Sequence, residues 1–260
     1  MPLLTGRVAI VTGASTGIGR ATGLLFAHEG AHVACAARSA ELVERTASEI
    51  RRLGGHAIAL AADLTRERDV AKLVEATTAE FGRIDCLVNN AGDGGPTKPV
   101  QEYSLEEWLD TVNSCLTTSY LCVRFTVPVM IAAGRGAIVN IASMAGRRGL
   151  PYRVGYCSAK AGQIGMTYGL ALELGRYNIT VNAIAPGAVE GDRIERVMAA
   201  QAAIRGTTVD AVRQAFIERS PLGRMSTAED VAYAAAFLCS DHARSISGQV
   251  LPINAGEPAS

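Results

Sequence analysis

Short, continuously apolar runs alternate along this chain with longer segments whose apolar residues have a helix-like spacing. The short runs predict buried strands, and the long segments predict helices. The predicted strands are Val8–Thr12, His32–Ala36, Ala57–Ala61, Cys86–Asn89, Ala137–Ile141, Thr180–Ile184 and Val250–Ile253. The predicted helices are Gly19–His28, Ala40–Leu53, Glu67–Phe81, Leu105–Ala133, Gly155–Leu174, Thr208–Ile217 and Ala228–Ser240.

Strands that are apolar throughout and separated by helices are typical of a parallel sheet covered on both faces. We therefore predict an α/β fold, a single doubly wound domain of Rossmann type over residues 1–260, with a seven-stranded, mostly parallel sheet. The 260 residues suffice for one such core, and the sequence has no internal repeat or low-complexity linker. Ligands of such sheets bind beyond the carboxyl ends of the strands.

A glycine-rich turn joins the first predicted strand to the first predicted helix. Its glycines, Gly13, Gly17 and Gly19, have the spacing G-x-x-x-G-x-G. Glycine lets a backbone turn tightly and approach a pyrophosphate, and the following helix N-terminus offers free N–H groups to the anion. The turn therefore predicts a phosphate-binding loop, and the alternative is a strand–helix turn that binds nothing.

Tyr156 and Lys160 are four residues apart in a predicted helix, so their side chains share one face. A cation beside a tyrosine stabilises the phenolate, and such a pair can exchange a proton with a substrate hydroxyl or carbonyl. Ser143 lies thirteen residues upstream of Tyr156. Singly, each of these is more often a surface or turn residue, but in this order, after the glycine turn, they predict a catalytic group.

The order of these motifs resembles that of the short-chain dehydrogenase/reductase family. The resemblance extends from about Leu4 to Ala255 and rests on Thr12–Gly19, Asn89–Gly92, Asn113, Ser143, Tyr156 with Lys160, and Pro186 with Gly187. It implies an NAD(P)-dependent oxidoreductase that interconverts a secondary alcohol and a ketone. Two alternatives stay open: a nucleotide-binding regulator without turnover, and a lyase or epimerase that uses bound cofactor transiently.

By this resemblance, Asn113, Ser143, Tyr156 and Lys160 form the catalytic group. Tyr156 is expected to be the general acid in reduction and the general base in oxidation. Lys160 is expected to support the tyrosine and hold the nicotinamide ribose, and Ser143 to bind the substrate oxygen. Asn113 is expected to distort its helix and hold a water that links the lysine to solvent; the alternative is a solvated or locally bending residue.

The resemblance also implies a set of cofactor contacts. They are Gly13, Ser15, Thr16, Gly17, Ile18, Gly19, Arg38, Asp63, Leu64, Asn90, Ala91, Gly92, Tyr156, Lys160, Pro186, Gly187 and Val189. Ala37 stands where NAD-binding relatives usually have an acidic residue, and the next residue, Arg38, can clamp a 2′-phosphate. This favours NADP(H) over NAD(H). One observation opposes a preference for NADP(H): Thr16 stands where NADP-type relatives often have a basic residue. The alternative for Arg38 is that it stacks on adenine or faces solvent.

Two positions depart from the family pattern. Gly191 stands where relatives typically have a threonine whose hydroxyl helps to bind the nicotinamide carboxamide. We therefore expect backbone groups, such as that of Val189, to hold the carboxamide. At the chain end, Asn254-Ala255-Gly256 stands where Asp-Gly-Gly is common.

The segment 190–222 is expected to form a helical lid over the substrate, within the single domain. It contains several arginines, and another basic cluster, Arg147, Arg148 and Arg153, lies between Ser143 and Tyr156. Two interpretations stay open: the arginines steer an anionic substrate, or they are solvated surface or a subunit contact. The candidate substrate contacts are Met144, Arg153 and Met198, and the alternative for the methionines is core packing.

Composition and charge limit the partners. The formal net charge is +0 at pH 7, which argues against a nucleic-acid partner. The apolar runs are interrupted, and the N-terminus has no signal-peptide pattern, so we expect no membrane partner and a cytoplasmic location. The six cysteines match no zinc-site spacing, so we expect no metal. By resemblance, the helices Leu105–Ala133 and Gly155–Leu174 form a homotetramer, with a dimer as the alternative.

Overall fold

A computed structural model describes residues 2–258 and contains one seven-stranded sheet. The strands are β1 (Val8–Thr12), β2 (His32–Ala37), β3 (His56–Ala61), β4 (Cys86–Asn89), β5 (Gly136–Ile141), β6 (Ile179–Pro186) and β7 (Val250–Ile253). Their order is β3-β2-β1-β4-β5-β6-β7, and every neighbouring pair is parallel. The predicted doubly wound α/β fold is confirmed, and each apolar run forms the strand that it predicted.

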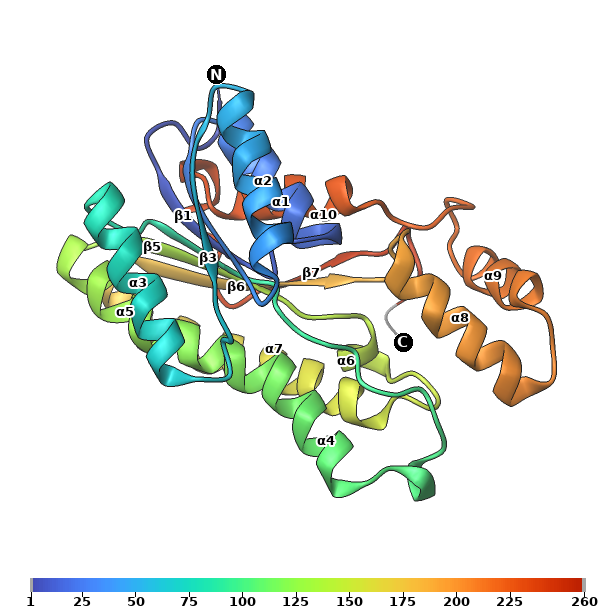
Figure 1. Cartoon of the computed structure of the whole chain (residues 1–260). Coiled ribbons are helices and arrows are strands. Elements are labelled where there is room, and N and C mark those ends of the chain that lie inside the picture. The colour runs from blue at the N-terminus through green and yellow to red at the C-terminus, as the bar shows by residue number, and fades with distance from the viewer. Residues whose placement is uncertain (1, 259–260) are drawn as a thin grey trace.

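Helices cover both faces of the sheet. They are α1 (Gly17–His28), α2 (Ala40–Arg52), α3 (Glu67–Phe81), α4 (Leu105–Val112), α5 (Thr118–Ala133), α6 (Ala145–Arg148), α7 (Val154–Leu174), α8 (Asp192–Arg205), α9 (Val209–Glu218) and α10 (Ala228–Leu238). Short 3₁₀ segments occupy Val100–Glu102, Gly175–Tyr177 and Asp241–Ala243. Helices α1, α2 and α10 lie on one face and α3, α5 and α7 on the other, while α8 and α9 project from one end of the sheet (Figure 1).

Successive strand residues bury their side chains on opposite faces of the sheet. Val11 and Val33 pack with Phe26 of α1 in one core. Ile10 packs with Leu73 of α3 in the other core. Because helices cover both faces, each strand residue meets apolar partners, which explains why the strands are apolar throughout.

The predicted helix Leu105–Ala133 is interrupted near its middle. A π-helical segment, η2 (Asn113–Thr117), separates α4 from α5, and the Thr118 N–H donates to the Asn113 carbonyl five residues back. Such single π turns are frequent at functional sites. The whole stretch is long and apolar enough to cross a membrane by length and composition, with a mean hydropathy of 1.4. The stretch also contacts α3, α7 and β4, so its apolar residues can pack in the protein core instead.

A buried ion cluster lies where the central strands begin. The Asp85 carboxylate is fully buried and accepts a hydrogen bond from the Val8 N–H at 2.9 Å. Its oxygens lie 2.5 Å from Arg83, 3.5 Å from Arg135 and 3.9 Å from Arg7. The cluster therefore ties the starts of β1, β4 and β5 together.

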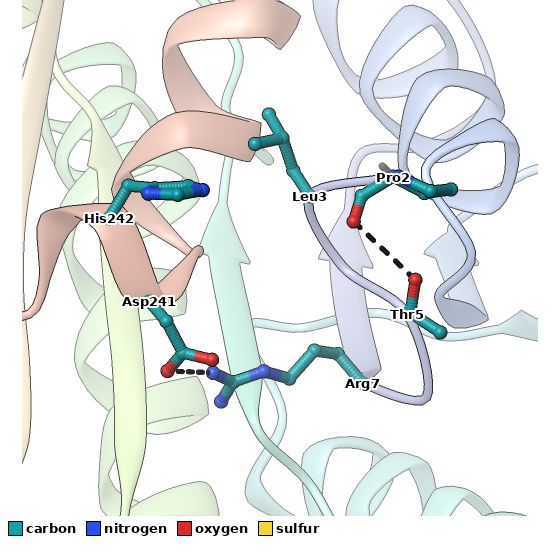
Figure 2. A pocket seen from close by; sticks show the side chains of 6 residues that line it. All are labelled: Pro2, Leu3, Thr5, Arg7, Asp241 and His242. Atoms are coloured by element: carbon teal, nitrogen blue, oxygen red, sulfur yellow. Dashed lines mark hydrogen bonds and ion pairs between the residues drawn. The ribbon is translucent and has the colours of Figure 1, made fainter.

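A hollow lies beside this cluster. Figure 2 shows Arg7 reaching Asp241 across it, with 2.6 Å between nitrogen and oxygen. The other residues that line it are Pro2, Leu3, Thr5 and His242. Arg7 immediately precedes β1, so the hollow is at the opposite edge of the sheet from the glycine turn, which follows β1.

Helices α8 and α9 form a pair with a small core of their own. Met198, Ala202, Val212, Phe216 and Met225 pack together there. The expected helical character of this segment is thus present, but Met198 is completely buried in the core of the pair. This burial supports the core-packing alternative for this methionine.

Candidate active site

The glycine turn lies between the carboxyl end of β1 and the start of α1. Gly13 and Gly17 have φ angles of 66° and 52°, which glycine adopts without strain. A Cβ at Gly19 would lie 2.1 Å from the Gly13 carbonyl oxygen, whereas a Cβ at Gly17 would meet nothing within 4 Å. Gly19 therefore allows the turn to close, and Gly17 leaves room in front of the free N–H groups of α1 for a phosphate.

Asn90 ties this turn to the end of β4. Its Nδ2 donates to the carbonyl oxygens of Thr12 at 3.0 Å and of Gly13 at 3.3 Å. In return, Thr12 Oγ1 accepts hydrogen bonds from the N–H groups of Asn90 and Ala91. Strands β1 and β4 are neighbours where the strand order reverses direction, which is where doubly wound sheets bind ligands. The structure thus brings both predicted cofactor motifs together.

Arg38 is exposed directly after the last residue of β2 and forms no ion pair within residues 2–258. Nearby, Asp63 accepts hydrogen bonds from the hydroxyl of Thr65 at 2.7 Å and from its N–H at 3.2 Å. The hydroxyl bond lowers the pKa of the Asp63 carboxyl, and Arg38 contributes in the same direction. Asp63 is only partly buried, so its role in this turn is compatible with a cofactor contact.

A hollow of about 600 Å³ lies between the start of α1 and the face of α2. Its lining consists of Ser15, Thr16, Arg20, Leu42, Arg45, Thr46, Ser48, Glu49 and Arg52. Arg20 is paired with Glu49 at 2.5 Å. Arg45 and Arg52 have no carboxylate partner in the described part of the chain, so the surface beside the glycine turn is basic.

Tyr156 lies on α7 with two cations close to its ring. Lys160 Nζ is 5.7 Å from the ring centre, and the guanidinium carbon of Arg153 is 4.8 Å from it. The structure thus confirms that Tyr156 and Lys160 share one helix face. Two cations therefore lie within 6 Å of the centre of this ring.

Lys160 is held by a buried chain of hydrogen bonds. Its Nζ donates to the Ile141 carbonyl at 2.7 Å and to Gln163 Oε1 at 2.8 Å. Gln163 Nε2 donates to Ser119 Oγ at 2.6 Å, and Ser119 donates to the Cys115 carbonyl at 3.0 Å. All three side chains are at most 2% exposed. The ammonium is therefore fixed in position, with one N–H left for a further partner.

Ser143 and Asn113 occupy different surroundings. The Ser143 hydroxyl oxygen accepts the N–H two residues further on at 3.1 Å, so its own O–H can donate to another group. Asn113 begins the π-helical segment, as expected of a residue that distorts the helix, but its exposed side chain accepts a hydrogen bond from Thr117. The hydrogen-bond chain from Lys160 reaches this segment at the Cys115 carbonyl instead.

The three arginines between Ser143 and Tyr156 separate in the structure. Arg148 is paired with Glu257 near the C-terminus at 2.5 Å, and Arg147 is exposed. Only Arg153 lies against Tyr156. Its burial lowers the pKa of the guanidinium, which nevertheless stays charged. Met144, the candidate substrate contact next to Ser143, is buried, as is Met198 in α8.

The segment after β6 offers backbone groups. The Ala188 carbonyl and the Glu190 N–H are both bonded to Ser226. In a parallel bridge of this kind, the intervening residue, Val189, directs its own N–H and C=O the other way. Gly187 packs closely on the chain end, since a Cβ there would lie 2.9 Å from that of Asn254. The N–H and C=O groups of Val189 are therefore not used in the bridge to Ser226 and can bind a ligand.

Sequence reasoning missed Gln163 and Ser119. Gln163 lies three residues after Lys160, and this helical spacing could have indicated the contact. Ser119 meets Gln163 only because two helices pack together, and no local pattern shows that. Arg193, at the start of α8, donates to the Gly92 carbonyl at 2.5 Å, which links α8 to the end of β4.

Comparison with known proteins agrees with this geometry. The family model described as enoyl-(acyl carrier protein) reductase matches residues 13–257. A 3-oxoacyl-[acyl-carrier-protein] reductase of Thermotoga maritima is 37% identical over 97% of this chain and 98% of its own. A cis-4-hydroxycyclohexanecarboxylate dehydrogenase of Sinomonas cyclohexanicum is 38% identical over 97% of each chain. The crystal structure of NAD+-bound xylitol dehydrogenase superposes with a TM-score of 0.94 at 34% identity, over 97% of this chain and 99% of its own.

The chain therefore belongs to the short-chain dehydrogenase/reductase family. It is an NAD(P)-dependent oxidoreductase that interconverts a secondary alcohol and a ketone. The family, the fold and the class of reaction that the sequence implied are confirmed.

Proposed function

We propose that Tyr156 is the general acid/base of this oxidoreductase and that NADP(H) is its preferred cofactor. The nicotinamide supplies and accepts the hydride. Tyr156 gives its proton to the carbonyl oxygen in reduction and takes it from the hydroxyl in oxidation, and Ser143 donates a hydrogen bond to the same oxygen. The observation that carries this proposal is the position of Tyr156 beside the fixed ammonium of Lys160.

Lys160 steadies the phenol and holds the ribose of the cofactor with its remaining N–H. The chain from Lys160 through Gln163 and Ser119 ends at the Cys115 carbonyl. Asn113 contributes by starting the π-helical segment that presents this carbonyl. The peptide carbonyl of a distorted helix thus anchors the catalytic lysine.

The residues at the glycine turn fit a dinucleotide. The open space at Gly17, with Ser15, Thr16 and Ile18 around it, suits the pyrophosphate. The other proposed contacts are Asp63 and Leu64 at the adenine, Asn90, Ala91 and Gly92 at the adenosine ribose, and Pro186, Gly187 and Val189 at the carboxamide.

The preference for NADP(H) is supported by the unpaired, exposed Arg38 and by the basic surface at Arg45 and Arg52. The ratio of kcat/KM with NADPH to that with NADH tests it directly. We expect the ratio to exceed one and to fall at least about tenfold in Arg38→Asp, because a carboxylate repels the 2′-phosphate. A ratio that is unchanged in this variant would assign the 2′-phosphate to other residues.

The remaining features follow the family. The whole chain, residues 1–260, acts as one NAD(P)-binding domain, and the segment 190–222 acts as its substrate lid. Tyr120, Tyr168 and Leu172 are 52%, 49% and 88% exposed on α5 and α7, which supports subunit contacts there, and we propose a homotetramer, with a dimer as the alternative. The proposed location is the cytoplasm. Light scattering of the purified protein measures the subunit number.

A panel of ketones assayed with NADPH and NADH tests the activity. The panel includes 4-oxocyclohexanecarboxylate, because one relative is named for the corresponding hydroxy acid. We expect turnover of at least one member. A protein that binds NADPH tightly but oxidises it with no ketone would support a nucleotide-binding regulator instead.

A further inference from the structure

Arg153 carries a guanidinium edge without a partner. The residue is only 4% exposed, and its Nε is buried with no hydrogen-bond partner within residues 2–258. Its Nη1 donates to Thr97 Oγ1 at 2.9 Å. Gly94 makes room for Nη2, since a Cβ at this glycine would lie 2.3 Å from that nitrogen. The Nε–Nη2 edge, which can grip a carboxylate with two parallel hydrogen bonds, is thus uncommitted.

The charge around Arg153 is positive. No carboxylate of the described chain lies within 4 Å of it. Burial lowers the pKa of the Arg153 guanidinium, and the like charge of Arg193 acts in the same direction. Two acidic side chains of the adjoining loop and helix have partners of their own. Asp93 accepts the Gly95 N–H, and Glu107 is paired with Lys98.

An unpaired buried cation is costly. Removing such a charge from water without a counter-ion is unfavourable, and a guanidinium does not avoid this cost by losing its proton. The face of the Tyr156 ring offsets only part of the cost. A bound anion would supply the missing compensation, and it would do so beside the residue that handles the proton.

We propose that the substrate carries a carboxylate, which the guanidinium of Arg153 binds, with Arg193 adding a second positive charge. This inference rests on the proposed function, because it takes Tyr156 as the residue that meets the reacting oxygen. The ketone or alcohol carbon lies at Tyr156, and the carboxylate lies toward Gly94 and Thr97. Because Arg153 is buried, it is not part of the solvated surface. Arg148, by contrast, already forms an ion pair with Glu257.

The test compares ketones as matched acid and methyl ester: acetoacetate, levulinate and 4-oxocyclohexanecarboxylate. For at least one pair, we expect the acid to have a kcat/KM about tenfold or more above that of the ester, because a charge-assisted hydrogen bond contributes about 1.5–3 kcal/mol. Arg153→Met should abolish that preference. Arg153→Lys, which keeps the charge and loses the fork, should retain part of it. Equal efficiency, or a preference for the ester, in every pair would overturn the inference.

Arg147→Met is the matched control, because it removes the same charge from an exposed position in the same segment. The acid-to-ester ratio should stay within about threefold of the wild-type ratio, since exposed charges are screened. If Arg147→Met lowered the ratio as much as Arg153→Met, the preference would come from overall charge and not from a site at Arg153.

Binding separates this inference from the proposed activity. With NADP+ present, cyclohexanecarboxylate should raise the melting temperature of the wild type, cyclohexanecarboxamide should not, and Arg153→Met should lose the response. This pattern would support the carboxylate site even if no ketone were turned over, a result that would count only against the activity. Turnover of neutral ketones without selective binding of the acid would contradict the carboxylate site alone.

Discussion

Polar atoms hold Lys160, one of the proposed catalytic residues, in a fixed position. Lys160 is nearly completely buried, but two of its three N–H groups have acceptors. These hydrogen bonds stabilise the buried charge and fix the direction of the third N–H group. The amide of Gln163 uses both of its polar atoms: the oxygen accepts a hydrogen bond from Lys160, and the nitrogen donates one to Ser119. Gln163 is therefore a positioning residue that acts through the lysine.

Replacing Gln163 by leucine should lower kcat/KM about ten- to a hundredfold, because a hydrogen bond to a charged group contributes roughly 1.5–3 kcal/mol.

Gln163→Glu is the matched variant, because it keeps an acceptor for Lys160. It should retain more of the wild-type kcat/KM than Gln163→Leu does. A Gln163→Leu variant with the wild-type kcat/KM would limit Gln163 to a structural role.

Among the helices, the clearest difference from the sequence-based prediction is the break in Leu105–Ala133. Apolar periodicity continues through Asn113–Thr117, so a π turn leaves no mark in it. The packing of the α8–α9 pair was equally hidden, since the burial of Met198 depends on α9 lying against α8. Both features arise from contacts between elements, which a pattern within one element does not record.

Gln201 of α8 is completely buried, and neither its Oε1 nor its Nε2 has a hydrogen-bond partner in the described chain. Gln201→Met should therefore stabilise the protein by about 1 kcal/mol, because it removes an unsatisfied buried amide of similar volume. Thermal unfolding measures this, with an expected rise of about 2–4 °C.

Gln214→Met on exposed α9 is the control and should change the melting temperature little, since its amide meets Glu218 at the surface. A lower melting temperature for Gln201→Met would mean that the amide of Gln201 is satisfied in solution.

At the scale of the whole protein, the ion cluster of Asp85 and the candidate active site lie at opposite edges of the sheet. The carboxyl edge carries the glycine turn and the catalytic group, while the amino edge carries Asp85 with its arginines. Asp85→Asn should lower the stability by about 1.5–3 kcal/mol, because it removes the charge of a fully buried carboxylate that three partly exposed arginines share. Urea unfolding at pH 7 measures this change.

Asp241→Asn is the control for Asp85. Asp241 also meets Arg7, but its side chain is 83% exposed, so its removal should cost less than about 1 kcal/mol. Equal losses in the two variants would show that burial of Asp85 contributes nothing.

The strands, their parallel order and the two ligand-binding motifs could be predicted from the sequence, because each depends on a local pattern or on a fixed spacing. Tyr156 with Lys160 is such a case. Arg153 is the opposite case: the sequence places it among three similar arginines, and only the fold buries it against Tyr156 while Arg148 pairs with Glu257. Long-range partners decide what each of these charges does.

Tyr156→Phe tests the central claim most directly, because it removes one hydroxyl and keeps the ring between its neighbours. We expect kcat for the best ketone to fall about a thousandfold, in the range for loss of a general acid/base, while the Kd for NADPH stays within about threefold of the wild-type value, because the ring and Lys160 are retained. A variant that keeps more than about a tenth of the wild-type kcat would contradict the assignment of proton transfer to Tyr156.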